Sequence, residues 1–263
     1  MKAEGFGRAF LLVAALLSAS ATLGSTAPQA AADESVDGCV KCHSNPDFLV
    51  TNKKLYDYYQ DWRASIHGQE GITCVDCHGG RAAAQTEQNA HGPHMPSSSS
   101  SSMVSFRNIP KTCGRCHDEL LTAYRSSSHF GHLERSQQGD LGPNCVTCHG
   151  SLKAAAPNVN TVRATCQTCH NSISANHPEI PIRAEALLND LNALRGYRRF
   201  ISLRAAPEVA PGILRVFDAG FADLARRWHT FDLDRIESES ETLLAYAREK
   251  RDLVRKERTG QQN

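Results

Sequence analysis

The chain has 263 residues with 29 basic and 28 acidic side chains, which gives a formal net charge of +1 at pH 7. This balance excludes nucleic-acid binding of the kind that needs a concentrated basic face. Ten cysteines and twelve histidines stand out in the composition, and their spacing decides which chemistry the chain supports.

Residues 1–32 have the features of a secretory signal peptide. Lys2 and Arg8 form a basic start, an apolar run covers 10–17, and three alanines at 30–32 offer a small-residue cleavage site. The apolar run is short for a helix that spans a bilayer. We therefore expect export and cleavage after Ala32, which would leave 27 basic and 27 acidic side chains.

All ten cysteines lie in five copies of Cys-x-x-Cys-His. This spacing is typical of covalent c-type haem attachment, in which two thiols bond to the haem and the adjacent imidazole becomes the proximal iron ligand. Zinc sites, disulfides and dithiol redox motifs also pair cysteines, but none of them explains the histidine. The sequence therefore predicts five covalently bound c-type haems, which take over part of the core. The motifs are Cys39/Cys42/His43, Cys74/Cys77/His78, Cys113/Cys116/His117, Cys145/Cys148/His149 and Cys166/Cys169/His170.

The first four motifs form an internal repeat. In each unit, an aromatic-Arg-x-Ser-x-His pattern, at 62–67 and at 124–129, lies between two motifs. Each second motif has the form Cys-Val-x-Cys-His-Gly. We therefore predict two dihaem modules, 39–80 and 113–150.

A serine-rich linker is predicted between the modules at 81–110. Its six consecutive serines favour an irregular, mobile segment, although iron binding by His91 or His94 would pin its near end. After the second module comes the fifth haem, predicted at 166–178. The pentahaem cytochrome c domain is thus expected to span 33–180.

The chain changes character in the C-terminal helical region, predicted at 181–263. It has no cysteines, and Pro207 and Pro211 are expected to separate the first of three helices from the second. Asp234 and Glu237 suit the start of the third helix. The fold class is therefore mainly α with little regular sheet: a haem-packed core plus a C-terminal helical bundle. Apolar residues recur at helical spacing, namely Leu187, Leu188, Leu191, Leu194; Ile213, Leu214, Phe217, Phe221, Leu224, Trp228; and Ile236, Leu243, Leu244, Leu253, Val254.

Distal ligands must come from outside the motifs, because each motif supplies only the proximal histidine. His67 and His129 occupy equivalent places in the two modules and are the strongest candidates, while His132 competes with His129. We expect His229, which follows Trp228 in the helical region, to be a core or interface histidine rather than a ligand. Methionine ligation is less favoured. The predicted distal candidates are His67, His91, His94, His129, His132 and His177.

The motif-bearing stretch from 39 to 178 resembles the multihaem cytochromes c related to nitrifier tetrahaem cytochrome and hydroxylamine oxidoreductase. The Cys-Val-x-Cys-His-Gly elements and the cysteine-free helical tail carry this resemblance, which implies closely spaced haems that pass electrons along the chain. All five motifs end in histidine, whereas pentahaem nitrite reductases carry a lysine at the catalytic haem. The cross-linked tyrosine of hydroxylamine oxidoreductases has no counterpart in Tyr197 or Tyr246. An electron carrier is therefore favoured over an enzyme.

Together these patterns predict a periplasmic pentahaem electron-transfer protein with mostly bis-histidine haems. Its partners would be redox proteins, such as a quinol dehydrogenase, a reductase or another cytochrome, and no nucleic acid. The helical region would brace the haem core or support self-association, and peripheral membrane association stays open. The alternative is a redox enzyme that acts on a nitrogen or sulfur oxyanion or on hydroxylamine at one open haem. A third reading is a redox-linked interaction or sensor subunit whose helical tail carries the function.

Overall fold

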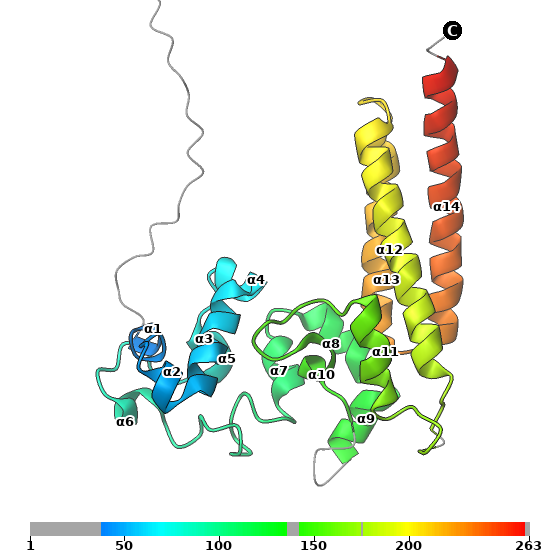
Figure 1. Ribbon diagram of the computed structural model, residues 1–263. Coiled ribbons are helices and arrows are strands. Elements are labelled where there is room, and N and C mark those ends of the chain that lie inside the picture. Colours follow the sequence, from blue (N-terminus) through cyan, green and yellow to red (C-terminus); the bar gives the residue numbers. More distant parts are fainter. Residues whose placement is uncertain (1–37, 136–141, 175, 261–263) are drawn as a thin grey trace, which may run out of the picture. The chain divides into compact units, whose positions relative to one another are not determined.

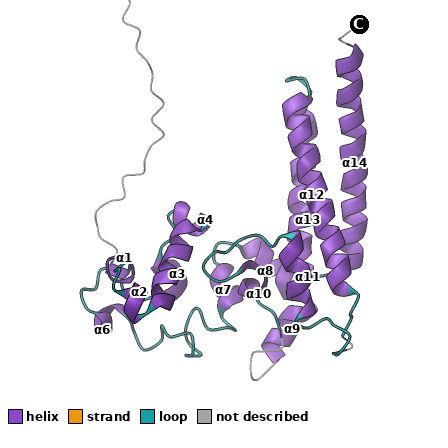
Figure 2. Cartoon of the chain, viewed as in Figure 1, coloured by secondary structure: helices purple, strands orange, loops and turns teal. Residues whose placement is uncertain are grey.

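The computed structural model describes residues 38–135, 142–174 and 176–260. Every regular element in these stretches is a helix (Figure 2), which confirms the mainly-α prediction. The predicted signal peptide at 1–32 lies outside the described residues.

Short helices make up the first motif unit (Figure 1). None of the six contains a buried residue. Since so little apolar surface is covered by protein, this unit needs another apolar partner to form a stable core. The helices are α1 (Gly38–His43), α2 (Phe48–Thr51), α3 (Lys53–Ala64), α4 (Ile66–Gln69), α5 (Cys74–His78) and α6 (Glu87–Ala90).

The serine-rich segment after α6 is irregular, as predicted, but it is packed rather than loose. Asn108 donates side-chain hydrogen bonds to the carbonyls of Ser100 and Ser102 at 2.9 and 2.7 Å. Ser102 is fully buried, and its hydroxyl donates to the carbonyl of Met95 at 3.0 Å. Composition suggested mobility, whereas these hydrogen bonds hold the backbone of the segment in place.

The second motif unit has more buried apolar residues than the first. Ile109, Tyr124 and Leu133 are all buried, and Leu133 has no exposed surface. This unit therefore has a small protein core of its own. Its helices, with the one that carries the fifth motif, are α7 (Ile109–Cys113), α8 (Asp118–Arg125), α9 (Ser128–Arg135), α10 (Cys145–His149) and α11 (Val159–Gln167).

Three long helices follow, as the apolar periodicity predicts: α12 (Ile180–Arg204), α13 (Ala210–Arg227) and α14 (Leu233–Gly260), with a 3-10 turn, η1 (Trp228–Thr230), between the last two. Helix α12 contacts α11, α13 and α14, and its leucines pack with Phe217 and Ile236 in a hydrophobic cluster. Pro211 was expected to lie between α12 and α13, and this expectation is wrong. It lies in the first turn of α13, where the missing N–H costs no hydrogen bond.

The start of α14 also differs from the prediction. Asp232, just before the helix, accepts a hydrogen bond from the backbone N–H of Arg235 at 3.2 Å. Asp234 and Glu237 instead accept from one guanidinium nitrogen of Arg183, at 2.6 and 2.8 Å. These acids therefore link α14 to α12 rather than cap α14, because a long arginine on the neighbouring helix reaches both.

Candidate haem sites

The second motif of each module is a single capped helical turn. In α5, the hydroxyl and backbone N–H of Thr73 donate to the Asp76 carboxylate at 2.6 and 2.7 Å. In α10, Asn144 accepts from the N–H of Val146 at 3.1 Å. Both helices end at a glycine with positive φ, 71° at Gly79 and 73° at Gly150, a conformation that side chains disfavour. These caps hold two cysteines and a histidine on one rigid turn.

An aromatic residue anchors the segment before each of these motifs. The indole N–H of Trp62 donates to the carbonyl of Ile72 at 3.0 Å. The hydroxyl of Tyr124 donates to the carbonyl of Pro143 at 2.5 Å. Each carbonyl lies two residues before the first cysteine of the motif. The sequence repeat is therefore matched by a repeat in hydrogen bonding.

A buried serine positions a histidine in each module. The Ser65 hydroxyl accepts from the N–H of Gly68, and the Ser127 hydroxyl accepts from the N–H of Phe130, both at 3.1 Å. Both serines are about one-twentieth exposed. Two residues after each serine come His67 and His129, in the first turns of α4 and α9. The shared turn thus presents the two histidines in the same local setting.

Cysteines of successive motifs lie close to one another. None of the ten forms a disulfide. Cys113 and Cys145, from the third and fourth motifs, share a hydrogen bond that raises the pKa of the Cys113 thiol and lowers that of Cys145. Burial raises the pKa of Cys77, and the neighbouring Cys113 raises it further. The second, third and fourth motifs are therefore neighbours in space as well as in sequence.

The fourth and fifth motifs are also close to each other, and so are the first and second. Burial raises the pKa of Cys148 in the fourth motif to about 11, with a further contribution from Cys166 in the fifth. Burial lowers the pKa of His78 in the second motif, and His43 in the first lowers it further. Each motif therefore has a residue near the next motif along the chain.

Three of the predicted haem-attachment cysteines are exposed in the described protein. They are Cys42, Cys116 and Cys169, the second cysteines of the first, third and fifth motifs, whereas the other seven are partly buried. Cys116 and Cys169 lie beyond the ends of α7 and α11, and Cys42 lies in α1, which contains no buried residue. Little of the described protein therefore covers these three thiols, so a bound haem would have to shield them. Attachment at all ten cysteines stays a prediction.

Four motif histidines face a histidine from outside the motifs at nearly the same distance. The ring centroids are 6.0 or 6.1 Å apart, while the angle between the rings ranges from 1° to 70°. The pairs are His43 with His91, His117 with His67, His170 with His129, and His149 with His229.

This combination of constant distance and variable angle fits two axial ligands of one iron. Metal–nitrogen bonds of about 2 Å and rings of roughly 1.2 Å radius place the two centroids roughly 6 Å apart. Rotation about a metal–nitrogen bond leaves that distance unchanged, so the spread of angles is compatible with ligation. The residues present therefore fit haem iron between each pair.

Ring hydrogen bonds at three of these histidines support the same arrangement. The Nδ1 atoms of His149, His170 and His229 lie 3.0, 2.8 and 3.1 Å from the carbonyl oxygens of Ala155, Asn176 and Ala225. A neutral ring that donates Nδ1–H to a carbonyl keeps Nε2 for a metal, as metal-ligating histidines commonly do.

Burial keeps several of these rings neutral. It lowers the pKa of His129 to about 4, with smaller contributions from His170 and His132. It also lowers the pKa of His149 and of His229. The neutral imidazole is the form that binds a metal.

The other predicted distal ligands lie elsewhere. The Nδ1 of His94 is 2.7 Å from the Ser101 hydroxyl, and that of His177 is 3.3 Å from the Glu179 carboxylate. Neither these two rings nor that of His132 faces a motif histidine at the common distance. All twelve histidines belong to the described part of the chain, and none of them lies opposite His78 in this way. His229, which we expected in a core or interface, is the one paired histidine that sequence reasoning left out.

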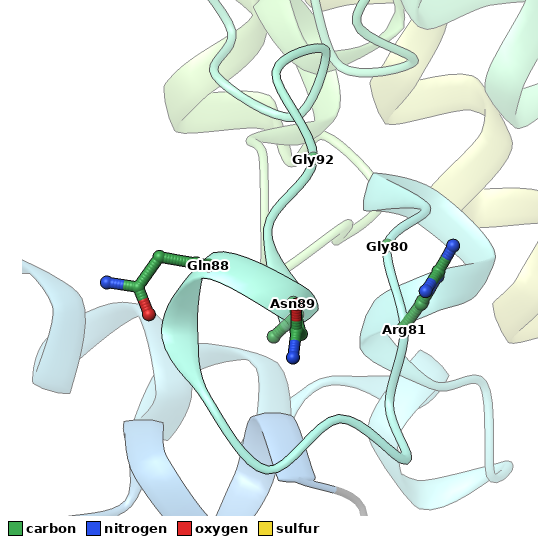
Figure 3. A pocket seen from close by; sticks show the side chains of 6 residues that line it. Gly80, Arg81, Gln88, Asn89 and Gly92 are labelled. Carbon is green, nitrogen blue, oxygen red and sulfur yellow. The ribbon is translucent and has the colours of Figure 1, made fainter.

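A small polar hollow lies beside the first module. Its volume is about 350 Å³, and Figure 3 shows the Arg81, Gln88 and Asn89 side chains around it, between the segment after Gly80 and helix α6. No motif residue lines it. Ala90 and Gly92, on either side of His91, are among its lining residues, but His91 itself is not.

Comparison with known proteins agrees with this geometry. Residues 99–171, which contain the third to fifth motifs, match the family of cytochrome c7 and related cytochromes c. Over 142 residues the chain is 29% identical to the C-type polyheme cytochrome OmcB from two strains of Geobacter sulfurreducens, DL-1/KN400 and ATCC 51573. That match covers 51% of this chain and only 16% of each relative. No solved structure matches the chain significantly.

The family match gives no direct support to the narrower nitrifier and hydroxylamine oxidoreductase resemblance, which stays a prediction. Among the residues with described placement, no helix is both long and apolar enough to span a membrane.

Proposed function

We propose that this multihaem c-type cytochrome is a periplasmic electron carrier with five haems, which exchanges electrons with other redox proteins. The observation that carries the proposal is the set of four opposed histidine pairs at 6.0–6.1 Å. Iron with two histidine ligands has no vacant position for a substrate, so it is suited to electron transfer.

Each haem would be held by two cysteines and the following histidine of its motif. We assign His91 as distal ligand to the haem of His43, His67 to that of His117, and His129 to that of His170. When bound, the haem supplies a reversible one-electron couple. The chain's own carbonyls orient the rings of His149, His170 and His229, and burial favours the neutral form of His129, His149 and His229.

The nearness of successive motifs favours electron transfer along the chain. Hydrogen-bonded Cys113 and Cys145, and the neighbouring Cys148 and Cys166, bring the attachment points of successive haems together. Attachment points this close favour short transfer distances between haems. A quinol dehydrogenase, a reductase or another cytochrome would supply or accept the electrons. The helical region braces the haem core or supports self-association, and the signal at 1–32 directs export.

The test is a haem count combined with a spin-state measurement on the exported protein. Mass spectrometry is expected to show five covalently bound haems on a chain that starts near residue 33. The ferric electron paramagnetic resonance spectrum is expected to be dominated by low-spin signals, with at least four low-spin haems. A predominantly high-spin spectrum, or fewer than five haems, would contradict the proposal.

A second candidate function is favoured by His78. Because no histidine faces this ring in the described residues, its haem is where an outside molecule would bind, as in a redox enzyme acting on hydroxylamine or on a nitrogen or sulfur oxyanion. One equivalent of high-spin haem, together with cyanide-sensitive turnover of such a molecule, would favour the enzyme. Fast electron exchange with a redox protein and no such turnover would favour the carrier.

A further inference from the structure

We infer that His229, in the turn between α13 and α14, is the distal ligand of the haem attached at Cys145 and Cys148. This inference deepens the proposed function, on which it rests, because it assigns the ligand of the fourth haem to the C-terminal helical region. The C-terminal helical region then binds haem directly, in addition to bracing the haem core.

The geometry of the His149–His229 pair matches that of the other three histidine pairs in distance. The two rings are parallel within 1°, and their centroids are 6.1 Å apart. Parallel rings can also stack with an offset at such a distance, as Phe217 and Phe221 do at 6.3 Å. The distance is the one found at the other three pairs, where the rings are tilted. Iron between the rings accounts for both the distance and its independence of angle.

The hydrogen bonds of the two rings also support ligation of iron. His149, a motif histidine, has its Nδ1 bonded to the carbonyl of Ala155, and His229 has its Nδ1 bonded to the carbonyl of Ala225. Each ring therefore keeps Nε2 for the metal. The carbonyl of Ala225 lies one helical turn before His229, so the end of α13 itself orients the ring.

The indole N–H of Trp228 is a further sign of a bound group at this turn. Trp228 directly precedes His229, and its Nε1 is buried without a hydrogen-bond partner in the described structure. An orphaned buried donor costs free energy unless an acceptor is supplied. A haem carries carboxylates that can serve as that acceptor.

The same turn is fastened to the second module by other contacts. Phe231 adopts a left-handed conformation, with φ of 58°, and its ring lies 4.3 Å from that of His129. The guanidinium of Arg226 pairs with Glu119 in α8 at 3.0 Å. Helix α8 also contacts η1. The turn therefore supplies one ligand to the fourth site and packs against the distal histidine of the fifth.

The experiment replaces His229 in the full-length, haem-loaded protein. His229→Ala is expected to convert one low-spin haem to high-spin, and added imidazole is expected to restore the low-spin signal. The matched control is His132→Ala, because His132 also lies outside the motifs but faces no motif ring. This control is expected to leave the spin states unchanged.

A second variant keeps the assignment testable if His229→Ala does not assemble with its haems. His229→Met keeps a ligand at the position, so one haem is expected to gain the far-red absorption of histidine–methionine ligation and a higher potential. An unchanged spectrum in both variants would overturn the assignment of His229 while leaving the carrier proposal intact. A wild-type protein that is mainly high-spin would instead remove the proposed function itself.

Discussion

The two haem modules share a local hydrogen-bonding pattern but differ in which residue faces the histidine of their second motif. Both use an anchored aromatic residue, a buried serine and a histidine two residues later. In the second module the motif histidine His149 faces His229 from the helical region, whereas the equivalent His78 faces no histidine in the described chain. A repeated local turn therefore fixes how a ligand is presented, while the surrounding structure decides what completes each site.

The ligands of the modules also cross between units. His67 of the first module faces His117 of the second, and His129 of the second faces His170 of the fifth motif. Each serine–histidine turn thus points to the first motif of the unit that follows. If these pairs ligate iron, loss of one turn disturbs a haem attached further along the chain.

The largest expected effect comes from removing all haem attachment. A chain with all ten motif cysteines replaced by alanine is expected to lose structure in α1 to α6, which bury no side chains, and to keep it in α11 to α14, which share a hydrophobic cluster. Hydrogen exchange measured by mass spectrometry would locate the loss. Equal protection of α1 to α6 and of α11 to α14 would contradict the expected difference between the two regions.

Next in size is a cavity in the helical region. Phe217→Ala removes a side chain with no exposed surface and is expected to lower the free energy of unfolding of the haem-loaded protein by about 3–5 kcal/mol. The neighbouring Val216, half exposed, is the control, since Val216→Ala is expected to change stability by less than about 0.5 kcal/mol. Denaturant titration measures both. Equal losses would show that this cluster does not hold the helices together.

The two serine–histidine turns can be compared directly. His67→Ala and His129→Ala are each expected to convert one haem to high-spin, and the double variant two, because each ring faces a different motif histidine. Electron paramagnetic resonance counts the high-spin haems. His94→Ala, whose ring contacts Ser101 instead, serves as control. A fully low-spin spectrum in either single variant would remove that residue from the ligand set.

The smallest effect concerns the buried serines. Ser65→Ala and Ser127→Ala each remove a helix cap and are expected to cost about 1 kcal/mol of stability. The exposed Ser126 is a matched control and should matter by only a few tenths of a kcal/mol. Similar losses in chemical denaturation would show that the turns are energetically equivalent. A loss confined to one module would show that tertiary contacts alter the turn.

What the sequence by itself determined is the local chemistry. The five Cys-x-x-Cys-His spacings, the repeated turn before His67 and His129, and the three long helices depend on residues close together in the chain, so they could be recognised without a structure. Expectations from local composition failed where specific side-chain hydrogen bonds intervened, one of them within the segment and two from a neighbouring helix. Asn108 holds the serine run, and Arg183 draws Asp234 and Glu237 away from capping.

Five motifs of one Cys-x-x-Cys-His pattern also gave no sign of how differently the protein would cover them. Cys42, Cys116 and Cys169 are exposed, whereas the cysteines of the second and fourth motifs are partly buried. The spacing within a motif is local, but the burial of its thiols depends on which helices pack beside it.

Only the tertiary structure decided which histidines face each other. His229 lies far along the chain from His149, and nothing near it in sequence marks it as a ligand. It reaches the fourth motif because α13 ends beside α8, where Arg226 and Phe231 hold the turn in place. His94 and His177, closer to the motifs in sequence, contact Ser101 and Glu179 instead. A distal ligand is set by proximity in space, and helix packing creates that proximity.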